Sequence, residues 1–384
     1  MAKDSGKLAV GFLFDDTLDS NDGVSQYVKT VGSWLTKNGH EVTYLVGESS
    51  LKTYAGGEVY SLSKNLGISW GGNRLSMSLI PRLGLIKKIV AEKDFDVVHV
   101  MFIYSPFMAQ FVINGLKPTT AVVGTVHIYP AHALSRLGSR LLKIIYGKSL
   151  RRFDKFISVS TAAASYAKKT FGLDSAVVPN TLNFEKFNSV RPKTTTPSQR
   201  IVFLGRLTKR KGCEHLIKAF GQVGKDVQGL ELIIAGDGPE RKKLEQLSDS
   251  LKIINRVRFL GFIKEEDKAS LLASADIACF PSLYGESFGI VLIEAMAAGA
   301  KVVLGGNNPG YASVLGAQPD LLIDPRNPTE FAGRLSTLLR DESKIKKLHD
   351  WQMAEVQKYD VNIIGADLLK IYQQAIVKRK QKMQ

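Results

Sequence analysis

The sequence predicts an α/β protein made of two doubly wound, Rossmann-like domains that face each other across a deep cleft. The chain has 384 residues, a length that suits two or three domains. Short apolar runs alternate with amphipathic segments, which is typical of strand–helix–strand units and parallel sheets. The alternation stops at residues 188–199, where two prolines and a run of threonines indicate a linker. We therefore expect domains at residues 1–190 and 200–360, and a final helix at 361–384.

The N-terminal half opens with a strand–helix–strand unit. Residues 8–14 are an apolar run, 15–23 a polar loop and 42–46 a second apolar run. Between the two runs, apolar side chains recur with helical spacing until Gly39: Val24, Tyr27, Val28, Val31 and Leu35. Further short buried strands are predicted at residues 97–101, 121–127, 156–159 and 176–179.

The C-terminal half repeats this alternation. Strands are predicted at residues 201–204, 230–235, 257–260, 277–280, 301–304 and 321–323. Helices are predicted at residues 213–222, 239–249, 288–298 and 328–340, and a last one at about 362–382.

The composition is close to that of an ordinary soluble enzyme, with 44% apolar and 23% charged residues. Only two cysteines are present, Cys213 and Cys279, which argues against a disulfide scaffold and a four-cysteine zinc site. No apolar run approaches the ~20 residues of a membrane span. The first residues lack the apolar core of a signal peptide, so a cytoplasmic location is expected.

The net charge is less ordinary. The chain has 52 Lys and Arg against 36 Asp and Glu, a net charge of +16. Such an excess implies an anionic partner: a nucleic acid, an anionic membrane or a phosphorylated substrate.

Residues 285–299, GESFGIVLIEAMAAG, carry the strongest functional signal. A loop of small residues leads directly into a helix, whose free N–H groups favour an anion such as phosphate. Glu286 and Glu294 are about 2.2 helical turns apart, so we expect their side chains on nearby faces. Carboxylates beside a phosphate site suit sugar or ribose hydroxyls. The alternative is a capped helix with Glu294 in solvent.

Residues 205–212, GRLTKRKG, bring several cations to the loop after the first strand of the second domain. Arg206 and Lys211 can hold a diphosphate and neutralise the charge of a departing leaving group. A solvated basic turn is the competing interpretation.

Three weaker signals lie at other strand ends. Residues 236–240 are more typical of a structural turn, because Pro239 suits a first helical position. Asp22-Gly23 opens a helix where a phosphate-facing turn would lie, although one glycine falls short of a dinucleotide fingerprint. His127 ends a strand and can hydrogen-bond substrate hydroxyls or assist proton transfer; a lone histidine is more often structural.

The order and spacing of these motifs resemble family 4 retaining glycosyltransferases of the GT-B fold. The resemblance is carried by Gly205-Arg206 with Lys211-Gly212, by residues 236–239, and by Glu286 with Glu294. It covers nearly the whole chain and is strongest over residues 200–305. The run at 285–299 looks most like bacterial phosphatidylinositol mannosyltransferases, which are membrane-associated enzymes that use GDP-mannose.

The resemblance implies a role for each matching position. The N-terminal domain would bind the acceptor, the C-terminal domain the nucleotide sugar, and the last helix would cross back to the N-terminal domain. Arg206 and Lys211 would bind the diphosphate, Glu286 the sugar hydroxyls and Glu294 the ribose. His127 would lie near the transferred sugar, and the catalytic set would be Arg206, Lys211, Glu286 and His127. The implied nucleotide-sugar contacts are Gly23, Gly205, Arg206, Lys211, Ile263 (near the base), Glu286, the backbone of Phe288, Gly289, Ile290 and Val291 (at the phosphates), and Glu294.

Three departures from the family pattern fall on the acceptor side. Asp22-Gly23 stands where the family usually has two glycines. Ser25 replaces the longer amide side chain of the inositol-lipid enzymes, and the loop at residues 15–22 is unusually acidic.

A basic segment at residues 134–155 suggests where an anionic membrane would bind. On a helix, its leucines and Ile145 would form one stripe and its cations another face, as in helices that lie on membranes. Burial of the leucines in the core is an equally good interpretation. Residues 82–93 offer a second, weaker basic surface. The predicted membrane-binding residues are Arg136, Arg140, Lys143, Arg151 and Arg152.

A nucleic acid partner is disfavoured. The sequence has no zinc-finger, RNP-type or arginine-glycine motif, and aromatic residues do not alternate with the basic run as in a stacking platform.

The resulting hypothesis is a retaining transferase that moves a hexose from GDP-mannose, or next UDP-glucose, to a lipid headgroup such as phosphatidylinositol. It would act at the inner face of a bacterial cell membrane, as a peripheral protein. No carboxylate nucleophile stands out, so the leaving diphosphate would assist the incoming hydroxyl on the same face of the sugar. No cofactor or essential metal is expected. The alternatives are a diacylglycerol, soluble or polysaccharide acceptor, or a catalytically silent nucleotide-sugar-binding partner protein. The sequence favours no oligomeric state.

Overall fold

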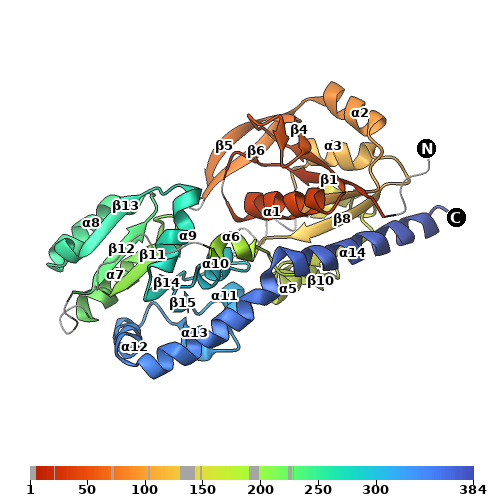
Figure 1. Ribbon diagram of the computed structural model, residues 1–384. Helices are drawn as coiled ribbons and strands as arrows, with labels where there is room; N and C mark the ends of the chain where they lie inside the picture. Colours follow the sequence, from red (N-terminus) through yellow and green to blue (C-terminus); the bar gives the residue numbers. More distant parts are fainter. Residues whose placement is uncertain are drawn as a thin grey trace. The chain divides into compact units, whose positions relative to one another are not determined.

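The computed structural model describes residues 6–20, 22–70, 73–102, 104–129, 143–147, 149–189, 199–223, 227 and 229–384, and the side chains of these residues except 66–77. The chain divides into two compact units, which are labelled by element in Figure 1. Unit 1 comprises Met1–Thr181 and Val361–Gln384, and unit 2 comprises Leu182–Asp360.

Unit 1 is built on an eight-stranded sheet with the strand order β10-β9-β8-β7-β1-β2-β4-β3. Its neighbours pair in parallel except β3 and β4. The strands are β1 (Ala9–Phe14), β2 (Glu41–Val46), β3 (Thr53–Tyr54), β4 (Gly57–Ser61), β7 (Val97–Phe102), β8 (Ala121–Val126), β9 (Lys155–Ser158) and β10 (Ala176–Val177). All residues of β7 and β8 are buried, as expected for parallel strands covered on both faces.

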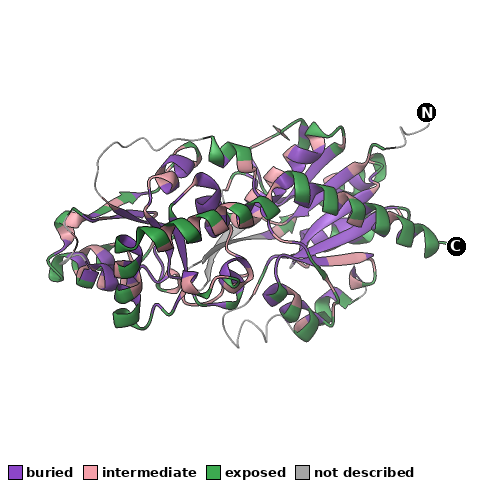
Figure 2. Cartoon of the chain, turned by 60° about the horizontal axis from the view of Figure 1, so that its bottom comes forward, coloured by how far each residue is buried: buried purple, intermediate pink, exposed green. Residues whose placement is uncertain are grey.

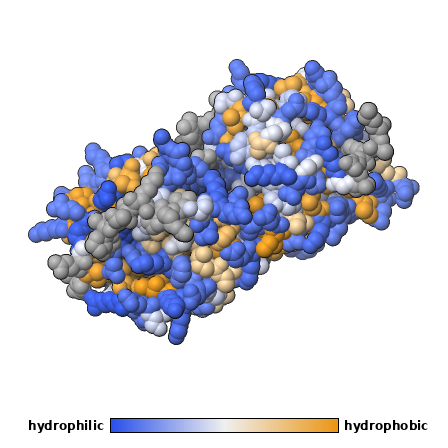
Figure 3. All heavy atoms as spheres, viewed as in Figure 1, coloured by the Kyte–Doolittle hydropathy of each residue, from blue (hydrophilic) through white to orange (hydrophobic). Residues whose placement is uncertain are grey.

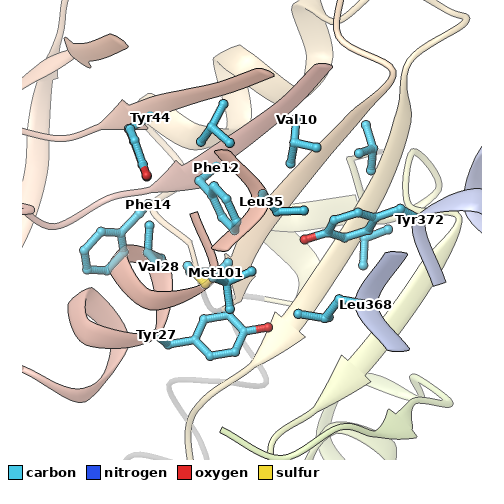
Figure 4. Packing of buried hydrophobic residues seen from close by; sticks show 14 of the residues in the cluster. Val10, Phe12, Phe14, Tyr27, Val28, Leu35, Tyr44, Met101, Leu368 and Tyr372 are labelled. Atoms are coloured by element: carbon cyan, nitrogen blue, oxygen red, sulfur yellow. The ribbon is translucent and has the colours of Figure 1, made fainter. Parts of the chain in front are cut away.

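The helices of unit 1 are α1 (Gly23–Lys37), α2 (Leu83–Glu92), α3 (Met108–Gly115), α5 (Thr161–Phe171) and α14 (Val361–Gln381). Helices α1 and α14 pack side by side, and their buried residues share one hydrophobic cluster with alternate residues of β1. Figure 4 shows Leu368 and Tyr372 of α14 packed near Tyr27 of α1 and Met101 of β7. The last helix therefore completes the core of unit 1.

Two contacts anchor α14 at its ends. The indole Nε1 of Trp34 donates to Asn362 Oδ1 at 2.8 Å, and Gly365 lies so close to this ring that a Cβ would be 2.5 Å from it. At the other end, Arg379 donates to the buried carboxylate of Asp154 at 2.9 Å. Asp154, the one acid of the predicted basic segment, is therefore a core ion-pair partner.

A two-stranded antiparallel ribbon in unit 1 was not predicted. Strands β5 (Ser63–Trp70) and β6 (Asn73–Pro81) pair with each other and form a separate sheet. The sequence signal was available, because Gly71-Gly72 between two extended runs is a typical hairpin turn.

Unit 2 is built on a six-stranded parallel sheet with the order β13-β12-β11-β14-β15-β16. Its strands are β11 (Arg200–Leu204), β12 (Glu231–Ala235), β13 (Val257–Gly261), β14 (Ile277–Phe280), β15 (Val302–Gly306) and β16 (Leu322–Ile323). Its α-helices are α6 (Phe184–Asn188), α7 (Cys213–Val223), α8 (Arg241–Ser250), α9 (Glu265–Ala273), α10 (Ile290–Ala298), α11 (Pro309–Leu315), α12 (Pro328–Arg340) and α13 (Glu342–Val356). Short 3₁₀ turns lie at Lys209–Lys211, Ile254–Arg256, Pro319–Leu321 and Gln357–Tyr359. In Figure 2 the strands of both sheets are largely buried and the outward faces of the helices are exposed.

The boundary between the units precedes the expected linker. Leu182 donates to the Tyr359 carbonyl at 3.1 Å, and Phe184 N–H donates to Asp360 at 3.0 Å. Residues 182–189 therefore belong with unit 2, although we placed residues up to 190 in the first domain. Most of the expected linker, residues 190–198, lies outside the described part of the chain.

Candidate functional site

The strand order of unit 2 creates a switch point between β11 and β14. From β11 the chain proceeds to β12 and β13 on one side, and then returns to β14 and β15 on the other. The loops after β11 and β14 therefore leave the sheet in opposite directions, which opens a crevice at their carboxyl ends. The two strongest sequence motifs occupy these two loops.

Glu286, in the loop after β14, is held by two cations from the loop after β11. Its Oε1 accepts from Arg210 Nη1 at 2.6 Å and from Lys211 Nζ at 3.0 Å. Only 12% of the Glu286 side chain is exposed. Arg210 also donates to the carbonyls of Tyr284 and Gly285, at 3.3 Å each. The sequence did not predict the contact between Arg210 and Glu286, although Arg210 lies in the motif at residues 205–212.

Burial and charge act against each other in this cluster. Burial alone would raise the pKa of Glu286, but Lys211 and Arg210 outweigh it, so the pKa is lowered and the carboxylate stays ionised. Burial lowers the pKa of Lys211, an effect that Glu286 opposes.

Arg206 adds a third cation. Its side chain is exposed, and its charge acts on both Arg210 and Lys211. These three cations and the Glu286 carboxylate together carry a net charge of two positive at the switch point. This local excess suits a diphosphate better than a single phosphate.

The first turn of α10 lies next to this cluster in the chain. Its N-cap is Gly289, which has φ +104° and provides no side chain to cap the helix. A Cβ at Gly289 would lie 2.5 Å from the Tyr311 ring, so only glycine fits. An uncapped helix N-terminus favours an anion at its first N–H groups. The side chain of Phe288 is buried, which leaves its backbone as the predicted contact.

Glu294 forms a second, separate ion pair. Its Oε1 accepts from Lys268 Nζ at 2.8 Å, and Lys268 also contacts Glu265 at 3.0 Å. Burial raises the pKa of Glu294, and Lys268 opposes this effect. The argument from helical spacing was wrong, because α10 begins at Ile290 and Glu286 lies in the preceding loop. Each glutamate is instead oriented by its own lysine.

Helix α9 follows the loop after β13 and contributes Lys268, the ion-pair partner of Glu294. This loop contains the exposed Phe262 and the half-buried Ile263, which was predicted to lie near a base. Lys268 lies one turn into α9 and holds Glu294. Lys268 was missed, since its sequence context is that of an ordinary surface helix.

The turn after β1 in unit 1 does not have the expected form. Asp22 caps α1, and its Oδ1 accepts from Val24 N–H at 2.9 Å and Ser25 N–H at 3.1 Å. A carboxylate therefore occupies the position that a phosphate would need at Gly23. Ser25, which replaces the family's amide, is fully buried and donates to the Ser20 carbonyl.

His127 follows β8 and is buried, with 7% of its surface exposed. Burial lowers its pKa to about 3, so the imidazole is neutral at pH 7. The ring suits hydrogen bonding to a hydroxyl. It does not suit proton transfer with an ordinary histidine pKa.

Two family models match the chain, one to each half. The model for glycosyl transferases group 1 matches residues 185–355, and that for glycosyltransferase family 4 matches residues 21–186. The chain belongs to the family 4 glycosyltransferases. The cation cluster, Glu286 and α10 lie within the group 1 match, whereas Gly23 and His127 lie within the family 4 match.

Relatives of this glycosyltransferase align over almost its whole length. The phosphatidyl-myo-inositol mannosyltransferase of Mycolicibacterium smegmatis is 28% identical over 374 residues, covering 95% of this chain and 94% of the relative. That of Propionibacterium freudenreichii is 28% identical over 382 residues, with the same coverage. The family resemblance predicted from the sequence is confirmed.

Solved structures show that the glycosyltransferase has the GT-B fold. Sucrose-phosphate synthase from Thermosynechococcus elongatus has a TM-score of 0.75 and 20% identity, covering 96% of this chain and 99% of its own. Anabaena HepE, solved in complex with UDP and glucose, has a TM-score of 0.73 and 18% identity, covering 95% and 99%. The predicted fold class is confirmed.

The predicted membrane-binding residues of the glycosyltransferase fall into three groups. Arg136 and Arg140 lie outside the described residues. Lys143 and Arg151 are exposed. Arg152 instead faces inward, where its Nη2 donates to the Lys117 carbonyl at 2.5 Å, so its role in the described structure is packing.

No group of three or more metal-ligating side chains occurs among the described residues of the enzyme. Asp94-Phe95-Asp96 has an Asp-x-Asp pattern, but Asp94 pairs with Lys117 and Asp96 accepts from Ala9 N–H at 2.8 Å. Both lie before β7, at the opposite end of that strand from the loops described above.

The enzyme is expected to lose stability as Asp15 ionises. Burial raises the pKa of Asp15 to about 7, from 3.8 for an ordinary aspartate. The folded state therefore binds this proton more tightly, and the stability that it contributes is lost as the pH rises from about 4 to 7. Replacing Asp15 with Asn should therefore raise the Tm more at pH 8 than at pH 5. At pH 8 the gain in the free energy of unfolding should be at most about 4 kcal/mol.

Asp19→Asn is the matched control for this comparison. Burial opposes the effect, but hydrogen bonds from Ser49 and Ser50 lower the pKa of Asp19, so this variant should lose stability at pH 8. Equal Tm changes for Asp15→Asn at pH 5 and pH 8 would contradict the assignment.

Proposed function

We propose that this glycosyltransferase moves mannose from GDP-mannose to the headgroup of a membrane lipid, with retention of the anomeric configuration. The observation that carries the proposal is the cation cluster at the β11–β14 switch point, with a buried glutamate and an uncapped helix beside it. Mannose and a lipid acceptor are suggested by the names of the mannosyltransferase relatives.

The cluster suits departure of a nucleoside diphosphate. Arg206 and Lys211 would neutralise the negative charge that develops as the sugar–phosphate bond breaks. Glu286 would accept hydrogen bonds from sugar hydroxyls, and Glu294 from the ribose. The departing phosphate would take the proton of the incoming hydroxyl on the same face of the sugar, which retains the configuration.

A lipid acceptor is supported by apolar side chains exposed beside cations in unit 1. Phe107, the N-cap residue of α3, and Phe111 within α3 are 43% and 48% exposed, and Ile144 and Ile145 are 77% and 44% exposed. Gln110 of α3 donates to the Ile145 carbonyl at 3.3 Å, which places the two segments together. Lys143 and Arg151 are exposed nearby in the chain. Figure 3 shows that hydrophobic patches interrupt an otherwise hydrophilic surface. Exposed apolar groups beside cations suit an anionic membrane surface.

Peripheral membrane association at the inner face of the cell membrane is part of the proposal. No helix among the described residues is both long and apolar enough to span a bilayer. Diacylglycerol and a soluble or polysaccharide acceptor are the alternatives that the experiments must separate.

A donor screen tests the proposal. Thermal unfolding is measured with GDP, UDP and ADP, and GDP is expected to raise the Tm most, because binding to the folded state stabilises it. Membrane lipid extracts are then incubated with GDP-mannose, and mass spectrometry should detect a lipid heavier by one hexose. A product found only with soluble acceptors would overturn the lipid assignment.

Binding to anionic liposomes should depend on the exposed apolar residues. Replacing Phe111 and Ile144 together by Ser should weaken cosedimentation with phosphatidylglycerol vesicles at least about tenfold, because two large apolar side chains no longer insert. Leu251→Ser, at an exposed position in unit 2, is the matched control and should bind as wild type. Wild-type protein that fails to sediment at low salt would refute membrane association.

A further inference from the structure

A group of cations lies at the amino-terminal edge of the sheet in unit 1. Asp154 directly precedes β9, and its buried carboxylate accepts from the N–H of Val122, the second residue of β8, at 3.0 Å. Two cations at the end of α14 hold the same carboxylate: Arg379 Nε donates to it at 2.9 Å and Lys382 Nζ at 3.1 Å. Substrates of open α/β sheets bind at the opposite, carboxyl edge, so these residues belong to no site described above.

Cations outnumber acids at this edge. Hydrogen bonds link Asp154 and four cations into what we call the amino-edge cluster: Arg152, Lys378, Arg379 and Lys382 with Asp154. Its net charge is three positive. Two neighbouring acids are engaged elsewhere, since Asp94 pairs with Lys117 and Asp96 accepts from Ala9 N–H at 2.8 Å. The cluster therefore favours an anion.

Arg152 is the cation of this cluster with spare hydrogen-bonding capacity. Its Nη2 donates to the Lys117 carbonyl at 2.5 Å, which is the packing contact described above. Its Nη1 is buried and has no hydrogen-bond partner among the described residues. Buried polar atoms are nearly always satisfied in native proteins, so this exception needs an explanation.

The two guanidinium groups of the cluster lie close to each other. Arg379 Nη2 donates to the carbonyl of Arg152, and burial and the charge of Arg379 both lower the pKa of Arg152. Asp154 opposes this effect, but its carboxylate is already bonded to Arg379 and Lys382. An added anion would offset the repulsion between the two arginines.

The dipole of α14 explains only part of the cluster. Cations in the last turn of a helix interact favourably with its C-terminal carbonyls, and Lys378, Arg379 and Lys380 lie in the last turn of α14. Arg152 lies outside this helix, before β9, so the dipole gives no reason for a fourth cation there.

We propose that the amino-edge cluster binds a phosphate group, which accepts a hydrogen bond from Arg152 Nη1 and is further attracted by the charges of Arg379 and Lys382. Guanidinium groups suit phosphate oxygens, and the Lys382 side chain is 40% exposed, so the cluster is open to solvent. The phosphate is either a soluble one or that of a lipid headgroup. The site lies in unit 1, apart from the cation cluster of unit 2, and does not depend on the proposed function.

A bound phosphate should stabilise the protein, because it joins the end of α14 to the segment before β9 only in the folded state. Thermal unfolding is measured in sodium phosphate and in sodium chloride of equal ionic strength, for wild type and for Arg152→Met. Phosphate should raise the Tm of the wild type more than that of the variant, and the fitted phosphate affinity should fall about tenfold in the variant. Phosphate at the cation cluster of unit 2 contributes equally to both proteins and cancels in the comparison.

Lys380→Met is the matched control. Lys380 is exposed and lies next to Arg379, so this variant loses the same charge from the same edge and should respond to phosphate as wild type does. Arg152→Lys serves if Arg152→Met does not fold. It keeps the charge but loses the two-pronged guanidinium, so its phosphate affinity should also fall.

Cosedimentation with vesicles of phosphatidic acid in phosphatidylcholine separates the two sources of phosphate. A soluble ligand is assigned if Arg152→Met loses only the response to sodium phosphate. A lipid headgroup is assigned if this variant loses vesicle binding while Lys380→Met retains it. The proposal is overturned if folded Arg152 variants match wild type in both assays, or if Lys380→Met loses as much as they do, which would indicate a diffuse effect of net charge.

Discussion

Replacing Lys211 with Ala is expected to lower kcat/KM for sugar transfer by about 10²–10³-fold, the range found when one charge-stabilising donor is removed from an active site. Lys211 is one of the two cations, with Arg210, that join the two loops at the β11–β14 switch point through Glu286. Its loss removes positive charge where the diphosphate departs and also loosens Glu286. Arg206→Ala should have a comparable effect.

Lys209→Ala is the matched control, because Lys209 is exposed in the same short turn. We expect it to retain nearly full activity. The fold of Lys211→Ala should survive, since Arg210 still pairs with Glu286 at 2.6 Å. Transfer rates that fall equally in all three variants would indicate a diffuse effect of net charge and would contradict the specific roles.

Replacing Lys268 with Met is expected to lower the free energy of unfolding by about 3–5 kcal/mol, the usual cost of removing one partner of a buried ion pair. For a unit of this size that corresponds to a fall in Tm of roughly 6–20 °C. The reason is that Glu294 is 4% exposed and would be left without its lysine. Because burial already raises the pKa of Glu294, the loss should be smaller at pH 5, where the carboxyl takes up a proton more readily.

The double variant Lys268→Met with Glu294→Gln separates this cause from a general packing defect. It removes the buried charge, so it should recover much of the lost stability. Lys264→Met is the control, since Lys264 is exposed and its contact with Glu266 is also exposed. A double variant less stable than Lys268→Met would contradict the ion-pair explanation.

Local sequence patterns predicted the parallel strands well, because buried parallel strands are short apolar runs with a clear start and end. Strand β14 was predicted with its observed bounds, and most others within one or two residues. Strands β3 to β6 were missed. Their residues are mixed in polarity, and they form an edge and a separate ribbon rather than the buried centre of a sheet.

The candidate site was partly predictable. Arg206, Lys211 and Glu286 lie in loops whose place at strand ends follows from the alternation of strands and helices. That Arg210 and Lys211 both bind Glu286 could not be read from the sequence, because it depends on which strands are neighbours. The same holds for Lys268 and Glu294, which are 26 residues apart in the chain.

On the acceptor side, motif matching did not predict the local structure correctly. Gly23 matched a phosphate-facing position, yet Asp22 fills the space with its own carboxylate.

The central claim is that the cluster at the switch point binds a pyrophosphate, and a comparison of GDP with GMP tests it most directly. Calorimetric titration of the wild type should give at least about tenfold tighter binding for GDP, since the second phosphate adds charge-assisted hydrogen bonds. The double variant of Arg206 and Lys211 to Ala should bind both nucleotides with similar affinity. Equal affinities in the wild type, or a preference for GDP that survives in the double variant, would contradict the account.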